Sequence, residues 1–409
     1  MMKKFTTYLA EEKNVHMEHL EDSVLNFGVK GARDAINFLQ SLRDMLSGST
    51  SRAINTTVKW DGAPAIFAGV DPTDGKFFVA KKGIFNKNPK IYKTESEIDA
   101  DLSGDLGDKF KLALRHLPKL GIEGVVQGDF LYSSDTLGTD TIDGEKVTTF
   151  HPNTIVYSVP YNSDLGRTIR NSSIGIVWHT TYTGDSFESM KASFGKDISS
   201  KLKNTKEVWH TDATYKDVSG SATMTEKETA AITSILSQAG KVFRKIDSKV
   251  LNAISSDEEI RTRIKTHFNT KVRAGEKITN PKAHVRDLLN YVIKYYDKQI
   301  ESKKTEKGKA PWIEKKKSMM RFFGGSNMSD LTQIFTLMNH IIDAKELIIK
   351  KMDKASSIGT FLKTRNGYEV TAPEGYVAIN NDGDAVKLVN RMEFSRANFS
   401  DEIIKGWQK

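Results

Sequence analysis

The order of β-prone and helix-prone stretches is the feature that most constrains the fold of this chain. Residues 51–220 consist of short β-prone runs separated by turns rich in Gly, Asp, Asn and Pro, whereas residues 222–358 have helical periodicity. The β pattern returns at residues 367–371, 374–379 and 385–389. Strands this short and this few need a larger sheet to join. We therefore predict that they complete the sheet of the first β-rich stretch and that the helical stretch is an insertion between the two parts.

Four regions follow from this pattern. Residues 1–50 are predicted to be an N-terminal helical segment, because apolar residues recur there at three- and four-residue spacing up to Gly48. Residues 51–220 and 360–409 are the two parts of an α+β core built from antiparallel sheets. Residues 222–358 are predicted to be a helical domain, since the helix beginning near residue 330 has an apolar stripe and a candidate cap at Ser329.

Composition limits the environment and the partners. No run approaches the roughly 18 consecutive apolar residues that a membrane span requires, and the N-terminus lacks the apolar core of a secretory signal. We expect a soluble, cytoplasmic monomer that does not bind membranes; if the source is a virus, the compartment is the host cytoplasm. The absence of cysteine excludes disulfides and thiolate chemistry, and the net charge of +9 favours polyanionic partners.

The candidate reactive residue is Lys59, in the sequence Lys59-Trp60-Asp61-Gly62. A lysine at the end of a β-prone run, followed by an acid and a glycine, can hold an amine against a phosphate while the backbone passes close to a ligand. We interpret residues 58–70 as a strand pair interrupted by a bend at residues 62–64. The alternative for these residues is a solvated lysine beside an ordinary Asp-Gly turn.

The other β segments add cations and acids. In chain order they supply Lys81 and Lys82, Asp129, Glu374 and Lys387. Attack on the α-phosphate of a nucleotide requires an unprotonated amine, which burial or nearby positive charge favours. Lys82 and Lys387 would supply that charge, and the two carboxylates are oxygen donors suited to Mg²⁺ or Mn²⁺. The alternative for each acid is a strand-end carboxylate paired with a lysine.

This order of residues resembles that of the covalent nucleotidyltransferases, the superfamily of ATP-dependent DNA ligases, RNA ligases and mRNA capping enzymes. Lys59-Trp60-Asp61-Gly62 is similar to their nucleotidyl-lysine motif. Similar segments follow at residues 80–85, 126–131, 373–378 and 385–391. The combination most resembles the RNA ligase 2 branch found in large tailed bacteriophages. Glu123 begins a competing match to the motif at residues 373–378, but no lysine-bearing strand follows it closely, so we assign Glu374.

The resemblance implies a nucleotidyltransferase core, ATP and Mg²⁺ (or Mn²⁺), and a lysyl-AMP intermediate. AMP would pass from lysine to a 5′-phosphate end, and a 3′-hydroxyl would then expel it. The implied catalytic residue is Lys59, and the implied metal ligands are Asp129 and Glu374. The implied nucleotide contacts are Asp61, Gly62, Lys81, Lys82, Asp129, Lys387 and an aromatic residue from strand 153–159 or 173–180, for which we choose Trp178.

Three departures from the family pattern limit what carries over. Ala63, Pro64 and Ala65 stand where many ligases have an arginine, and Val389 stands where a second lysine is common. The 22 residues after Lys387 are too few for the C-terminal OB domain of DNA ligases and capping enzymes, so none is expected.

Cations interleaved with aromatic residues in the helical stretch suit a phosphate backbone and unstacked bases. The residues chosen as nucleic-acid contacts are Arg261, Arg263, Lys304, Lys315, Lys316 and Arg321. We therefore predict an ATP-dependent ligase of RNA ends, DNA ends or both. A GTP-dependent capping-type guanylyltransferase and a non-catalytic nucleic-acid-binding protein on the same scaffold remain alternatives.

Overall fold

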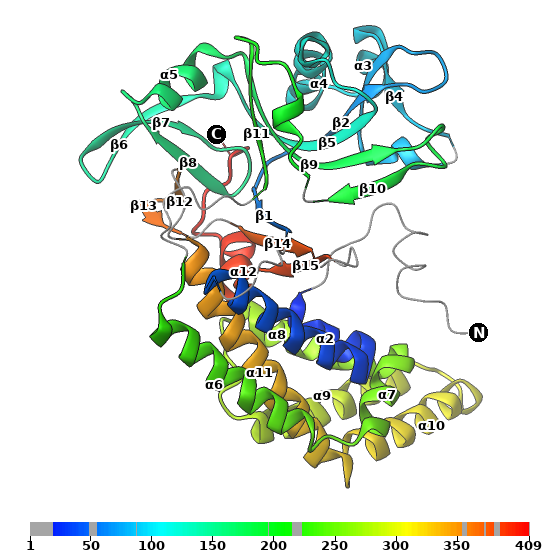
Figure 1. Cartoon of the computed structure of the whole chain (residues 1–409). Coiled ribbons are helices and arrows are strands. Elements are labelled where there is room, and N and C mark those ends of the chain that lie inside the picture. The colour runs from blue at the N-terminus through cyan, green and yellow to red at the C-terminus, as the bar shows by residue number, and fades with distance from the viewer. Residues whose placement is uncertain are drawn as a thin grey trace.

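The computed structural model describes residues 19–48, 55–86, 88–194, 196–214, 223–353, 358–371, 374–379 and 385–408. The described chain is a mixed α+β protein with largely antiparallel sheets, as predicted. Figure 1 shows its arrangement: β-sheets with short helices form the upper part, a layer of longer helices forms the lower part, and a small sheet with helix α12 lies between them. No described helix is both long and apolar enough to cross a lipid bilayer.

The largest sheet has the strand order β10-β9-β5-β2-β3-β4, and β11 pairs in parallel with β9. Its strands are β2 (Ala65–Val70), β3 (Phe77–Ala80), β4 (Ile91–Tyr92), β5 (Val125–Ser133), β9 (Ile174–Thr183), β10 (Lys191–Phe194) and β11 (Val208–Asp212). One face packs on α4 (Gly104–His116), where Phe110 and Ala113 share a buried cluster with Ile66 and Phe130. The other short helices of this upper part are α3 (Glu95–Asp101) and α5 (Asp164–Asn171).

Two further sheets contain the strands that follow the helical stretch. The five-stranded sheet has the order β13-β12-β8-β7-β6, and the three-stranded sheet has the order β1-β14-β15. Their strands are β6 (Gly138–Ile142), β7 (Glu145–Phe150), β8 (Ile155–Pro160), β12 (Gly359–Thr364), β13 (Gly367–Val370), β1 (Asn55–Lys59), β14 (Gly375–Ile379) and β15 (Ala385–Leu388). The prediction that the late strands join early ones is confirmed, although they join two sheets instead of one. β14 pairs with β1, whereas β13 is connected to β8 through β12, a strand that was not predicted.

The prediction of two strands interrupted by a bend at residues 62–64 is confirmed, but the two strands do not pair with each other. β1 and β2 belong to different sheets, and the bend at residues 60–64 carries the chain from one sheet to the other. Ala63 and Pro64 instead exchange backbone hydrogen bonds with Phe130 of β5. The alternation of residues 55–70 indicated two strands but could not identify their partners.

The helical layer consists of seven helices in the described residues. They are α2 (Ser23–Leu46), α6 (Glu226–Phe243), α7 (Ser248–Ser256), α8 (Glu258–Arg273), α9 (Pro281–Glu301), α10 (Glu306–Phe323) and α11 (Asn327–Met352). The helix of the predicted N-terminal segment, α2, packs on α6, α7 and α11. The predicted cap at Ser329 is wrong, because α11 begins at Asn327 directly after the Gly324-Gly325 break, and Ser329 lies in its first turn.

A buried ion cluster joins the helical layer to helix α12. Lys345 of α11 donates to Glu21 at 2.7 Å, and both side chains are almost completely buried. Arg391, at the start of α12 (Arg391–Phe399), donates to Asp22 at 2.8 Å and to Asn269 of α8 at 2.6 Å. Two cations and two carboxylates thus neutralise one another at the point where the N-terminal segment, α8, α11 and α12 meet.

Candidate lysine and carboxylate site

The register of the three-stranded sheet brings distant parts of the chain together. Lys59 is opposite Gly375, and Val377 lies between Thr57 on one side and Lys387 on the other. Directly opposed residues share a face, and side chains alternate along a strand. Lys59 and Lys387 therefore lie on one face of this sheet. The other face packs into the core of the helical layer through Tyr376 and Leu388.

Lys59 forms an ion pair with Glu374, the residue just before β14. The side chains are 24% and 11% exposed, so the pair is mostly buried but remains partly accessible. Burial raises the pKa of Glu374 to about 7, although the charge of Lys59 acts in the opposite direction. The competing residue Glu123 is exposed before β5, far along the chain from these strands. The contact with Lys59 therefore favours the choice of Glu374 over Glu123.

Asp61 is buried and holds the start of β8. Asn153 donates to one of its oxygens at 2.6 Å, and the backbone amides of Thr154 and Ile155 donate to the other at 2.6 and 2.7 Å. The Asp61 amide donates to the Tyr157 hydroxyl at 2.7 Å. Burial raises the pKa of Asp61, and these hydrogen bonds oppose the shift. Both carboxylate oxygens are used by the protein, so Asp61 has a structural task that differs from the predicted nucleotide contact.

Gly62 is required for the close packing of this bend against β5. A Cβ atom at this position would lie 2.5 Å from the Cβ of Asp129 and 3.1 Å from the carbonyl oxygen of Phe130. Asp129 is opposite Ala65 in the large sheet, and its side chain is 22% exposed. The segment that carries Lys59 thus packs directly on the strand that carries Asp129.

Tyr157 accepts a hydrogen bond from the Asp61 amide and was not predicted as a site residue. Burial raises the pKa of its hydroxyl well above the usual range, and the charges of Asp61, Glu374 and Asp129 act in the same direction. Its ring packs on Trp60 with centroids 5.0 Å apart. Strand 153–159 was one of the two strands proposed to carry an aromatic residue, but the ring of Tyr157 is covered rather than open to a base.

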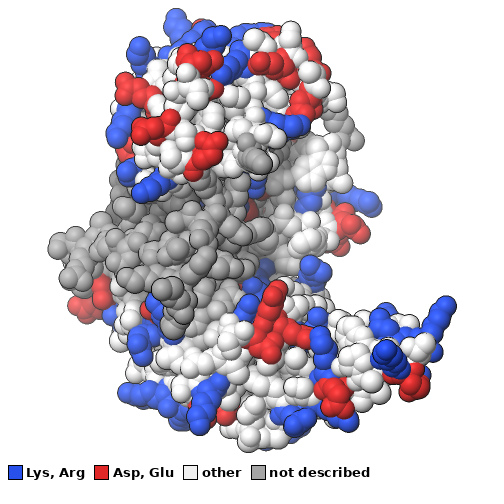
Figure 2. Space-filling model, turned by 90° about the vertical axis from the view of Figure 1, so that its right-hand side faces the viewer, with Lys and Arg blue, Asp and Glu red and all other residues white. Residues whose placement is uncertain are grey.

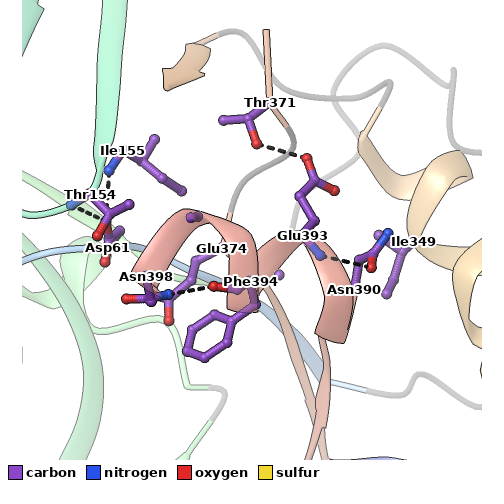
Figure 3. Close-up of a pocket in the computed structure, with 12 residues that line it drawn as sticks. Asp61, Thr154, Ile155, Ile349, Thr371, Glu374, Asn390, Glu393, Phe394 and Asn398 are labelled. Atoms are coloured by element: carbon purple, nitrogen blue, oxygen red, sulfur yellow. Dashed lines mark hydrogen bonds between the residues drawn. The ribbon is translucent and has the colours of Figure 1, made fainter. Parts of the chain in front are cut away.

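A small cavity adjoins Glu374 and Asp61. Its volume is about 30 Å³, and α12 closes one side of it with Glu393, Phe394 and Asn398 (Figure 3). Glu393 accepts a hydrogen bond from Thr371 at 2.8 Å, which holds α12 in this position. A volume of this size holds about one water molecule. As formed by the described residues, this cavity is too small to enclose a nucleotide.

Three predicted nucleotide contacts lie elsewhere. Trp178 is fully buried in the core between the large sheet and α4, so its ring has no open face and the stacking role assigned to it is not supported. Lys81 donates to Asp101 of α3 at 3.1 Å. Lys82 is exposed at the turn that follows β3. The apolar run at residues 173–180 did not reveal which face of this strand a helix covers.

The predicted nucleic-acid contacts have separate environments in the helical layer. Arg261 donates to the carbonyl oxygen of Ser255 at 2.6 Å, and the guanidinium of Arg263 stacks on Tyr295. Two of the lysines are ion-paired, Lys315 with Glu259 at 3.1 Å and Lys316 with Asp297 at 2.5 Å; Lys304 and Arg321 are exposed. Acidic and basic side chains are intermixed on the face seen in Figure 2 rather than separated into one basic surface.

The carboxylates fit a divalent cation only with help from another ligand. Among the residues that the structure describes, no group of three His, Asp or Glu side chains is arranged to hold a metal. Mg²⁺ is usually bound by one or two carboxylates together with substrate phosphates and water. Asp129 and Glu374 suit that role because their side chains are 22% and 11% exposed and remain accessible to a ligand.

The fold and this site define a mixed α+β protein in which a lysine and several carboxylates meet between two sheets. The chain belongs to a family of unknown function, DUF6267, whose model matches residues 14–403. Comparisons with curated proteins and with solved structures found no match.

Proposed function

We propose that the protein is an ATP-dependent polynucleotide ligase that forms a lysyl-AMP intermediate on Lys59. The observation that carries this proposal is the contact between Lys59 and Glu374, two residues 315 positions apart that β1 and β14 bring together. Lys387 on the same face of the sheet adds a second cation. The order of these residues resembles that of the covalent nucleotidyltransferases, which supports the same proposal.

In the first step, Nζ of Lys59 attacks the α-phosphorus of ATP, and the bond from that phosphorus to the bridging oxygen breaks to release pyrophosphate. The amine must lose a proton before it attacks. The Glu374 carboxylate touches Nζ and can accept that proton. Lys387 lies where its charge offsets the negative charge that develops on the phosphates. When bound, Mg²⁺ would neutralise phosphate charge, with Asp129 and Glu374 as its protein ligands.

In the later steps, AMP passes to the 5′-phosphate of an RNA or DNA end, and a 3′-hydroxyl attacks that phosphorus and expels AMP. Exposed cations of the helical layer, such as Lys304 and Arg321, are available to contact the nucleic-acid backbone. Because the cavity next to Glu374 holds only about one water molecule, the proposal requires α12 to move or ATP to approach Lys59 from its exposed side.

The proposal is tested by incubating the purified protein, first stripped of bound AMP, with Mg²⁺ and ATP labelled at the α-phosphate. Label that survives denaturing electrophoresis and is lost in Lys59→Ala is the expected result. Label from GTP alone would indicate a capping-type guanylyltransferase instead. The small cavity favours one other candidate, a non-catalytic nucleic-acid-binding protein, and absence of an adduct with either nucleotide would leave that function in its place.

A further inference from the structure

A β-bulge next to Asp129 exposes a histidine that the proposed mechanism does not use. β5 and β9 pair Gln127 with Thr180 and Gly128 with Trp178, so His179 has no opposite residue in β5. Gly128 permits this irregularity, because a Cβ there would lie 2.4 Å from the carbonyl oxygen of Val177. Bulges redirect a side chain and are common beside active sites.

His179 and Asp129 lie close together but do not form a hydrogen bond. Nε2 of His179 lies 3.7 Å from Oδ2 of Asp129, which is too long for a hydrogen bond. The two side chains are 27% and 22% exposed, so a ligand can reach both. Two ligand atoms that each lie about 2.1 Å from the same metal ion are roughly 3.0–3.4 Å apart. A small rotation of either side chain would shorten the observed distance of 3.7 Å to this range.

The other ring nitrogen of His179 has a partner that suits metal binding. Nδ1 lies 2.7 Å from Oγ1 of Thr180, a residue that is completely buried. When Nδ1 carries the proton and donates it to Thr180, Nε2 presents its lone pair toward the Asp129 carboxylate. Metal-binding histidines commonly donate their second ring nitrogen in this way, which fixes the ring orientation. Two acceptors that face each other without a hydrogen bond are brought together by a cation.

We propose that His179 and Asp129 bind one divalent cation and that the site prefers Mn²⁺ to Mg²⁺. An imidazole ligand favours transition metals, whereas Mg²⁺ prefers oxygen ligands alone. Gly62 packs directly on Asp129, so the cation lies beside the segment that carries Lys59. A role of this cation in nucleotidyl transfer rests on the proposed function. Binding of the cation by His179 and Asp129 does not depend on that function.

The test measures Mn²⁺ binding by the loss of the electron paramagnetic resonance signal of the free ion. The full-length Lys59→Ala protein is titrated with MnCl₂, alone and with ATP, so that no adduct forms. His179→Ala and Asp129→Ala are each made in that background. His340→Gln, a half-buried histidine of α11, is the matched control. Mg²⁺ is then added as a competitor, and thermal unfolding verifies that each variant is folded.

We expect Mn²⁺ binding to weaken at least about tenfold in His179→Ala and in Asp129→Ala and to be unchanged in His340→Gln. We also expect His179→Ala to reduce the preference for Mn²⁺ over Mg²⁺. Binding that is lost in Asp129→Ala but kept in His179→Ala would refute the role of His179. Absence of Mn²⁺ binding with and without ATP would overturn the proposal. Failure of the ligase proposal is recognised separately, by the absence of an adduct on wild-type protein.

Discussion

The buried ion pair between Lys345 and Glu21 provides the sharpest test of how the N-terminal segment is held to α11. Lys345→Met removes the ammonium but keeps the aliphatic volume. Among the described residues, Arg391 is then the cation that remains paired with Glu21, and its guanidinium is 3.5 Å away and already donates to Asp22. Both members of the original pair are at most 1% exposed. We expect the variant to lose about 3–5 kcal/mol of unfolding free energy, because a buried carboxylate has lost its nearest cation.

Urea unfolding of Lys345→Met, of Glu21→Gln and of the double variant measures this effect as a double-mutant cycle. The double variant should be much more stable than the sum of the two single losses indicates, because it leaves neither charge without its partner. Lys317→Met is the control, since its pair with Glu314 is more than half exposed and should be worth less than about 1 kcal/mol. A loss below about 1 kcal/mol in Lys345→Met would refute the reasoning.

Three further predictions concern the site and its surroundings. Gly62→Ala should abolish Lys59 labelling, because the added Cβ would meet Asp129, whereas Gly240→Ala, where the added Cβ has nothing within 4 Å, should preserve it. Phe394→Ala should lower the ATP concentration needed for labelling if α12 obstructs the cavity; an unchanged KM would show that it does not. Burial raises the pKa of Asp353 from 3.8 to about 6, so the folded state holds this proton more tightly than the unfolded state. The resulting stabilisation is complete below pH 3.8 and is lost as the pH rises through 6. Unfolding experiments should find a loss of about 2–3 kcal/mol over this range that is absent in Asp353→Asn.

The sequence predicted where strands and helices form better than it predicted which strands pair with each other. The separated β-prone runs correctly indicated that the late strands pair with early ones, since strands so short cannot be stable alone. The sequence did not reveal that the late strands join two different sheets, because a strand pattern identifies a buried face and not the neighbouring strand. The same limit explains the bend at Gly62, which connects two sheets instead of two paired strands.

Only those residues of the candidate site whose side-chain charge indicates a chemical role could be predicted from the sequence. Lys59, Glu374 and Lys387 were chosen as charged residues at strand ends, and the sheet brings them to one neighbourhood. Trp178 was chosen for its aromatic ring, but burial depends on α4, which covers its face of the sheet. His179 was missed because only a bulge in the register redirects it, and the sequence signal was no more than a glycine, Gly128, in the facing strand.

Helix α12 links the candidate site to the helical layer. It starts at Arg391, which is bonded to Asp22 and to Asn269 of α8, and its next turns line the cavity beside Glu374. A movement of α12 that enlarges this cavity must therefore disturb a buried ion pair, which costs several kcal/mol. A ligand that binds the helical layer and loosens Arg391 would reduce that cost, and nucleotide binding would then strengthen binding of that ligand by the same factor. If the proposed function holds, nucleic acid on the helices and ATP at Lys59 are expected to bind cooperatively.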